Sequence, residues 1–152
     1  MNLWNRLLVG VSEDPHSLDA VRYVASVLGG SDACRIRLVA VYIPQDLDAF
    51  AGDREAWADD AARRKEELWD RLETARRELV EAGLPEYNVS SELVEAQGRT
   101  VGATLMDEQK KGGFGTMVVG RRGLSKAEEF LFGSVSNTVI HRAVDCCVWV
   151  VA

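Results

Sequence analysis

The chain has 152 residues, of which 47% are hydrophobic, a length that supports one hydrophobic core but is short for two ordinary domains. We therefore expect a single domain over residues 1–152. The 24 acidic residues outnumber the 18 Lys and Arg, so the formal net charge of −6 disfavours binding to the phosphate backbone of DNA or RNA.

The N-terminal region contains only a short apolar run, from Leu7 to Val11. This run is too brief for a signal peptide or a membrane span, so we expect a cytoplasmic protein without membrane contact. Three cysteines, Cys34, Cys146 and Cys147, fit neither a disulfide framework nor a zinc site in number and spacing. The favoured interpretation is that they are buried structural thiols, and the alternative is a redox pair formed by Cys146 and Cys147.

The first two elements have clear signals. Residues 6–11 are apolar, apart from Arg6 at the start, which is typical of a strand buried on both faces of a parallel sheet. Asp14 as N-cap and Pro15 in the first turn predict the start of a helix, which the pair Gly29 and Gly30 ends.

The next two elements are a strand and a long charged helix. Residues 35–43 are rich in β-branched residues and stop at Pro44, which predicts a second strand. Residues 53–83 carry apolar side chains at helical spacing, and the charges between them predict a solvated face. Trp57 and Trp69 on this helix are expected to serve packing or partner contacts rather than to stack on a cofactor.

The remaining elements continue the alternation. We expect an edge strand over 88–95, a helix over 100–111, a strand over 117–120, a helix over 134–143 and a last strand over 147–151. Alternation without an internal repeat predicts right-handed βαβ crossovers and an open parallel sheet. In such sheets ligands bind beyond the C-terminal ends of the strands where the strand order reverses, so site residues should follow strands one, two and four.

One loop carries a motif, G-x2-G-x9-G-S, between the fourth strand and the last helix. Gly120, Gly123 and Gly133 lack a Cβ, which allows a sharp turn and lets phosphate oxygens approach main-chain amides. The amides that begin at Ser134 open a helix, whose N-terminus attracts anions, and the hydroxyl of Ser136 can add a donor. Phosphate binding is favoured over the alternative, in which the glycines only form turns and a serine caps the helix.

This motif, together with the closing residues 146–151, resembles the ATP-binding branch of the universal stress protein family over nearly the whole chain. The resemblance implies a Rossmann-like α/β fold: an open, twisted, five-stranded parallel sheet with helices on both faces and strand order 3-2-1-4-5. It also implies a stress-response protein that binds an adenine nucleotide. The implied cofactor is ATP, with Mg²⁺ or Mn²⁺ as an optional companion, and the implied assembly is a homodimer through the last strand, residues 148–151.

The resemblance also assigns site residues. Gly10 and Val41 match contacts to the adenosine part, residues 120–126 match the ribose and phosphate loop, and residues 134–136 match the turn that grips the phosphates. The expected nucleotide-binding residues are Gly10, Val11, Ser12, Val41, Gly120, Arg121, Arg122, Gly123, Leu124, Ser125, Lys126, Gly133, Ser134, Val135 and Ser136.

Ser12 departs from the family pattern, which typically has Asp at this position. A carboxylate there would suit hydrogen bonding to the nucleotide or its metal, whereas serine offers only a neutral hydroxyl. Glu13 or Asp14 could substitute from a neighbouring position. Affinity and metal dependence therefore depend on which of these groups faces the ligand.

No catalytic residues and no metal site are assigned. His16 and His141 lie far apart in sequence, and the chain has no G-x4-G-K-[ST] loop. We expect at most slow ATP hydrolysis or autophosphorylation, as the resemblance allows. Two alternatives to a nucleotide-binding module stay open: a nucleotide-independent dimeric interaction protein that docks through the long helix, and a slow ATP hydrolase.

Overall fold

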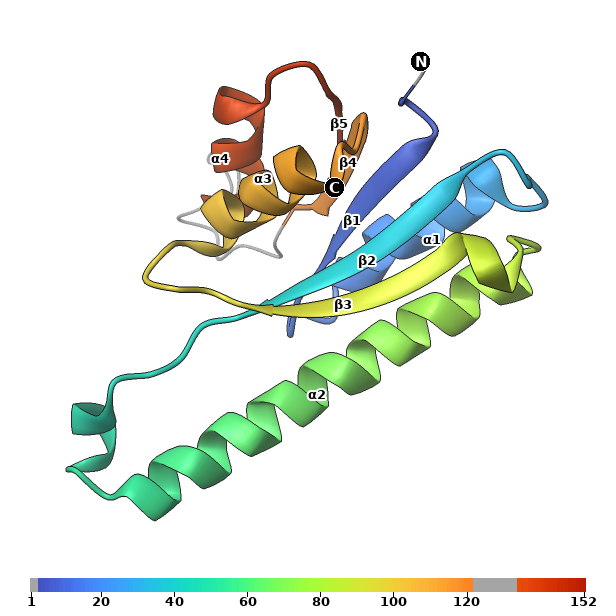
Figure 1. Ribbon diagram of the computed structural model, residues 1–152. Helices are drawn as coiled ribbons and strands as arrows, with labels where there is room; N and C mark the ends of the chain where they lie inside the picture. The colour runs from blue at the N-terminus through green and yellow to red at the C-terminus, as the bar shows by residue number, and fades with distance from the viewer. Residues whose placement is uncertain (1–2, 122–133) are drawn as a thin grey trace.

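The computed structural model describes residues 3–121 and 134–152. Within these two segments, five parallel strands form one sheet in the order β3-β2-β1-β4-β5, which confirms the expected fold class and strand order (Figure 1). The strands are β1 (Arg6–Val11), β2 (Arg35–Tyr42), β3 (Val89–Glu95), β4 (Thr116–Gly120) and β5 (Cys147–Val151).

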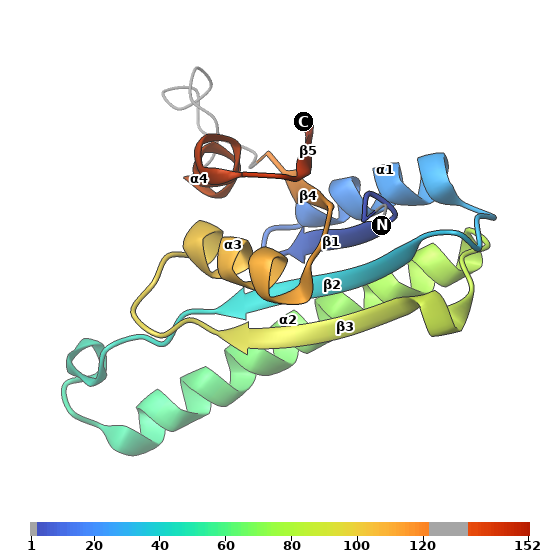
Figure 2. The same ribbon diagram turned by 45° about the horizontal axis from the view of Figure 1, so that its top comes forward.

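Helices cover both faces of the sheet, as Figures 1 and 2 show. One face packs against α1 and α2, and the other packs against α3 and α4. The helices are α1 (Ser17–Leu28), α2 (Arg54–Glu81), α3 (Val101–Gly112) and α4 (Ser134–Arg142), with short 3-10 turns η1 (Leu47–Phe50) and η2 (Glu86–Asn88).

The central strand β1 explains the continuous apolar run near the N-terminus. Leu7 and Val9 face α1 and α2, whereas Leu8 between them faces α3 and α4. All three side chains are at most 2% exposed. Burial of each such side chain contributes about 1.5–3 kcal/mol, so the strand is held from both sides.

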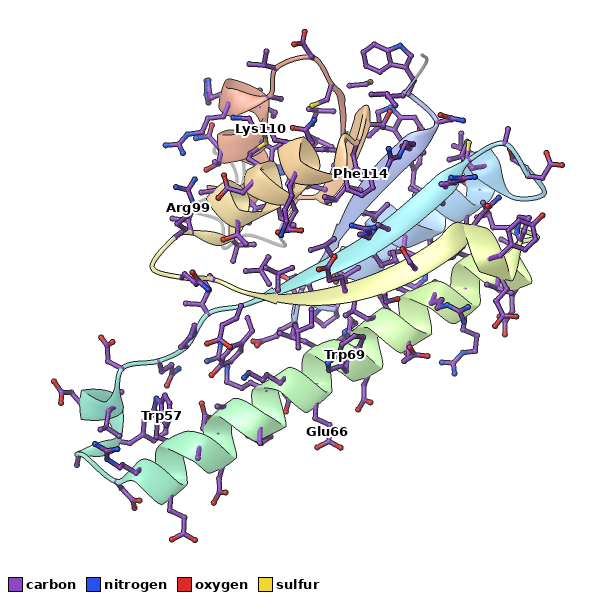
Figure 3. All side chains as sticks on the ribbon, viewed as in Figure 1. Trp57, Glu66, Trp69, Arg99, Lys110 and Phe114 are labelled. Atoms are coloured by element: carbon purple, nitrogen blue, oxygen red, sulfur yellow. The ribbon has the colours of Figure 1, made fainter. Side chains whose placement is uncertain are left out.

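The long helix α2 is anchored to the sheet by only part of its length. Asp53 caps it by accepting a hydrogen bond from the amide of Ala56 at 3.1 Å. Its fully buried side chains all lie in the C-terminal half, and its N-terminal turns extend beyond the sheet beside η1 (Figure 1). There Trp57 packs locally, with its indole Nε1 donating to the carbonyl of Gln45 at 2.7 Å, while Glu66 points away from the sheet (Figure 3).

The start of α1 differs from the sequence prediction. The carboxylate of Asp14 accepts a hydrogen bond from the amide of His16 at 2.8 Å, and the carbonyl of Asp14 accepts one from the amide of Ser17 at 3.0 Å. These two bonds close a turn around Pro15. The helix therefore begins at Ser17, and the prediction that Asp14 is its N-cap is wrong.

The cysteines are less buried than expected. Cys147 is exposed, because β5 is an edge strand with β4 as its neighbour, and Cys34 and Cys146 are only partly buried. Cys146 packs against the α3 and α4 side of the core. Burial, with smaller contributions from Cys147 and Asp145, raises the pKa of the Cys146 thiol. The raised pKa keeps the Cys146 thiol protonated and so lowers its reactivity.

Candidate functional site

A cavity of about 370 Å³ lies at the C-terminal ends of β1, β2 and β4. This is where the strand order reverses, because β1 pairs with β2 on one side and with β4 on the other. The volume falls in the range of small-ligand sites. Of the residues predicted from sequence, those that line the cavity are Gly10, Val11, Ser12, Val41, Gly120, Arg121 and Val135.

Among the described residues, Ser136 is the predicted site residue that does not line the cavity. Ser136 is fully buried, so its side chain is not exposed to a ligand. The side chain of Ser134 lies outside the described residues. Also outside the described residues are Arg122, Gly123, Leu124, Ser125, Lys126 and Gly133.

Gly10 keeps part of the cavity open. A Cβ at this position would lie 3.3 Å from Cδ1 of Leu105 and 3.6 Å from Cγ1 of Val119, and both of these residues line the cavity. Gly120 has room for a side chain. Its backbone is not left-handed, and a Cβ there would lie 3.6 Å from the carbonyl oxygen of His16, an ordinary contact. Gly120 is the last residue of β4, and the turn expected after this strand lies outside the described residues.

The loop after β1 is held by its own hydrogen bonds. The hydroxyl oxygen of Ser12 accepts a bond from the amide of Asp14 at 3.2 Å, and the hydroxyl of Ser17 donates to the carbonyl of Ser12 at 3.0 Å. The hydroxyl proton of Ser12 is not used in these contacts. Oδ1 of Asp14 closes the next turn, but Asp14 and Glu13 both line the cavity, so either carboxylate stays a candidate substitute for the missing Asp.

Arg64 is a wall residue that the sequence analysis missed. It reaches the cavity from α2, and its Nη1 donates to the carbonyl of Ile43 at 3.2 Å. Its Nε lies 3.5 Å from a carboxylate oxygen of Glu13, and its guanidinium carbon lies 5.1 Å from the ring centroid of Tyr42. The available signal was its position one turn before Leu68, which places both side chains on the same face of the helix.

The two arginines in the wall belong to different ends of the cavity. Arg64 lies at the β2 and α2 end, and Arg121 follows β4 at the other end. The acidic groups, Glu13 and Asp14, belong to the loop after β1, where His16 also contacts the cavity. A ligand with a polar, negatively charged end therefore meets a cation at the β4 side.

Two further structural findings bear on function. Within residues 3–121 and 134–152, no group of three or more His, Cys, Asp or Glu side chains is arranged to hold a metal ion. Among the same residues, no helix combines the length and apolar character that a membrane crossing requires.

Comparison with known proteins gives a family and a fold. The sequence model of the Universal stress protein family matches residues 4–152. A search of curated proteins finds no significant match. Among solved structures, a hypothetical protein whose biochemical function was assigned from its structure has a TM-score of 0.77 at 18% identity, over 99% of this chain and 96% of the other.

Two similar structures contain nucleotides. A universal stress protein in complex with cAMP has a TM-score of 0.71 at 22% identity, over 99% of each chain. The universal stress protein from Archaeoglobus fulgidus in complex with dAMP has a TM-score of 0.63 at 16% identity, over 99% of this chain and 100% of the other. At these identities the likeness establishes the fold.

Proposed function

Because the chain belongs to the universal stress protein family, we propose that it is a regulatory module that binds an adenine nucleotide, ATP, in the cavity beyond β1, β2 and β4. The observation that carries the proposal is that Gly10, Val41, Gly120 and Val135, which come from different parts of the chain, line one cavity. The cAMP and dAMP bound to two proteins of the same fold support the choice of ligand.

The two ends of the cavity suit the two ends of a nucleotide. The β2 end is lined by the apolar side chains of Val39, Val41 and Ile43, which suit a flat base. The β4 end has Arg121 and the beginning of α4, near Val135, where the N–H groups of the first helical turn and the helix dipole favour phosphate. We therefore orient the base toward β2 and the phosphates toward β4 and α4.

The proposal includes a metal ion bound with the nucleotide and a role for Ser12. Mg²⁺ or Mn²⁺ would accompany the nucleotide mainly through phosphate oxygens and water, because Mg²⁺ is commonly bound by few protein ligands. Ser12 would donate its hydroxyl proton to the nucleotide, while Asp14 and Glu13 keep their internal contacts. We assign no catalytic residue and no turnover.

We also propose a homodimer through residues 148–151 of β5, in the cytoplasm, where the ATP pool is available. In the single chain β5 has β4 as its neighbour and lies at the edge of the sheet. Trp149 packs edge-on against Tyr23 at 5.9 Å between ring centroids, and Tyr23 itself remains 45% exposed. An apolar edge strand of this kind is stabilised by pairing with a second copy.

The nucleotide content of the purified protein, read by chromatography, tests the proposal together with calorimetric titration of the nucleotide-free form. ATP at about one per subunit, or micromolar affinity on titration (about −8 kcal/mol), is the expected result. Sedimentation analysis of the same sample measures the dimer. A folded dimer that binds no ATP, ADP or AMP would identify a nucleotide-independent interaction protein, the alternative favoured by Ser12 in place of Asp.

A further inference from the structure

We propose that Arg64 is a base-binding residue of the cavity, and that its guanidinium donates hydrogen bonds to an acceptor nitrogen of the nucleotide base. This inference rests on the proposed function and deepens it. It concerns a residue of α2, the helix that the sequence analysis assigned to packing and docking rather than to the site.

The helix phase brings Arg64 into the wall. Leu68, one turn later, is 1% exposed and packs in the core between α2 and the sheet. Because side chains four residues apart lie on the same face of a helix, Arg64 points toward the sheet as well. Its side chain is only 18% exposed, which is low for arginine, and it lines the cavity beside Ile43.

Neighbouring groups hold the guanidinium in a defined plane. The Ile43 carbonyl accepts from Nη1 at 3.2 Å, and the Tyr42 ring lies beneath the guanidinium carbon at 5.1 Å. Glu13 approaches Nε at 3.5 Å, a long contact for an ion pair. The guanidinium has five N–H donors, and within the described part of the chain Nη2 makes no hydrogen bond. The side chain is thus oriented while donors remain available.

The location of Arg64 in the cavity indicates that it contacts the base of the nucleotide and not the phosphates. Arg121 and the start of α4 lie at the end of the cavity proposed for the phosphates, and Arg64 lies beside the apolar β2 residues, where we place the base. Since a guanidinium is a donor without acceptors, it fits ring nitrogens of a purine, which are acceptors. A contact with the base has the same strength whether the ligand carries no phosphate, one or three.

The adjacent Arg63 is a matched control. It has the same chemistry on the same helix, but its side chain is 59% exposed and forms ion pairs with Asp60 at 2.7 Å and Glu67 at 2.8 Å. It does not line the cavity. Arg63→Met and Arg64→Met therefore remove the same group at neighbouring positions, of which only one faces the proposed ligand.

The test is calorimetric titration of wild type, Arg64→Met and Arg63→Met with adenosine, AMP and ATP. Arg64→Met should weaken binding of all three ligands by one shared factor of about tenfold or more, the usual effect of losing a hydrogen bond to a charged group. Arg63→Met should bind each ligand within about twofold of wild type.

Three results would overturn the assignment in distinguishable ways. Unchanged affinity in folded Arg64→Met would remove Arg64 from the site while leaving nucleotide binding intact. A loss that grows from adenosine to ATP would show a phosphate contact instead of a base contact. A wild-type protein that binds none of the three ligands would refute the proposed function itself. If Arg64→Met does not fold, the same titrations are made with Arg64→Lys, which keeps the positive charge but lacks the planar guanidinium. An equal loss of affinity for adenosine, AMP and ATP supports the proposal, and unchanged affinity refutes it.

Discussion

Replacing Gly10 with valine should weaken nucleotide binding about a hundredfold without unfolding the protein. The Cβ would lie 3.3 Å from Cδ1 of Leu105, tighter than ordinary contact, and the two γ carbons would extend further into the space that Val119 also borders. Overpacking of this kind costs about 1–3 kcal/mol, which is less than the 5–15 kcal/mol typical of a folded domain. Since a bound nucleotide would be displaced by the same atoms, its binding free energy should fall by about 3 kcal/mol, or roughly a hundredfold in affinity.

The assay separates a filled cavity from general loss of stability. Urea unfolding followed by tryptophan fluorescence gives the change in stability, and calorimetric titration with ATP gives the affinity. Leu72→Ala is the control, because Leu72 is 0% exposed but lies outside the cavity wall. It should lower the free energy of unfolding by about 2–5 kcal/mol and leave affinity unchanged under conditions where it is folded. Folded Gly10→Val that binds ATP within twofold of wild type would refute the location of the site.

Three further predictions concern single positions. Ser12→Asp should raise the affinity for ATP with Mg²⁺ about tenfold, because a carboxylate binds Mg²⁺ directly, which outweighs loss of the hydroxyl donor; titration with and without Mg²⁺ measures this, and equal affinities in wild type and variant would remove Ser12 from the site. Gly102→Ala should lower the free energy of unfolding by about 1 kcal/mol, because its Cβ would lie 2.8 Å from the Cβ of Thr138 and force α4 away from α3; urea unfolding measures this, and a gain in stability would contradict it. Alkylation of Cys146 should rise at higher pH in the folded protein than in the urea-denatured chain, because burial raises the pKa of its thiol and keeps it protonated; mass spectrometry that resolves it from Cys147 measures the two profiles, and coincident profiles would contradict the shift.

The sheet could be predicted from sequence because burial on both faces leaves a local signal. In β1, Leu7, Leu8 and Val9 are all buried, although they face different layers of helices. A continuous apolar run of this kind predicts a strand even when the adjacent strands of the sheet are unknown. The position of the cavity follows from the same parallel arrangement, since the strand ends and the reversal of strand order depend on topology rather than on side-chain detail.

The contribution of α2 to the cavity could not be predicted, because it depends on how that helix docks. In sequence, Arg63 and Arg64 are neighbours in one charged segment and have the same chemistry. Leu68 identifies the face of the helix that is buried, and Arg64 is on that face. Which residues of the sheet Arg64 meets depends on where α2 packs over the sheet. That position is a property of the packed core and has no local signal in the sequence.

The start of α1 shows a different limit. Asp14 followed by proline is compatible with a helix cap, and also with a turn in which the aspartate side chain bonds to the backbone two residues on. Both use the same short-range hydrogen bonds. The structure contains the turn, and the loop it belongs to places Ser12 in the cavity wall.

The central place of β1 in the sheet has a consequence for synthesis of the chain. Leu7 pairs with Ile36 of β2 and with Thr116 of β4, so the second neighbour emerges 80 residues after the first (116 − 36). At about 5–20 residues per second, one edge of β1 stays unpaired for roughly 4–16 s on the ribosome. An open strand edge is a template for pairing with other chains, so the nascent protein passes through an aggregation-prone interval before its sheet can close.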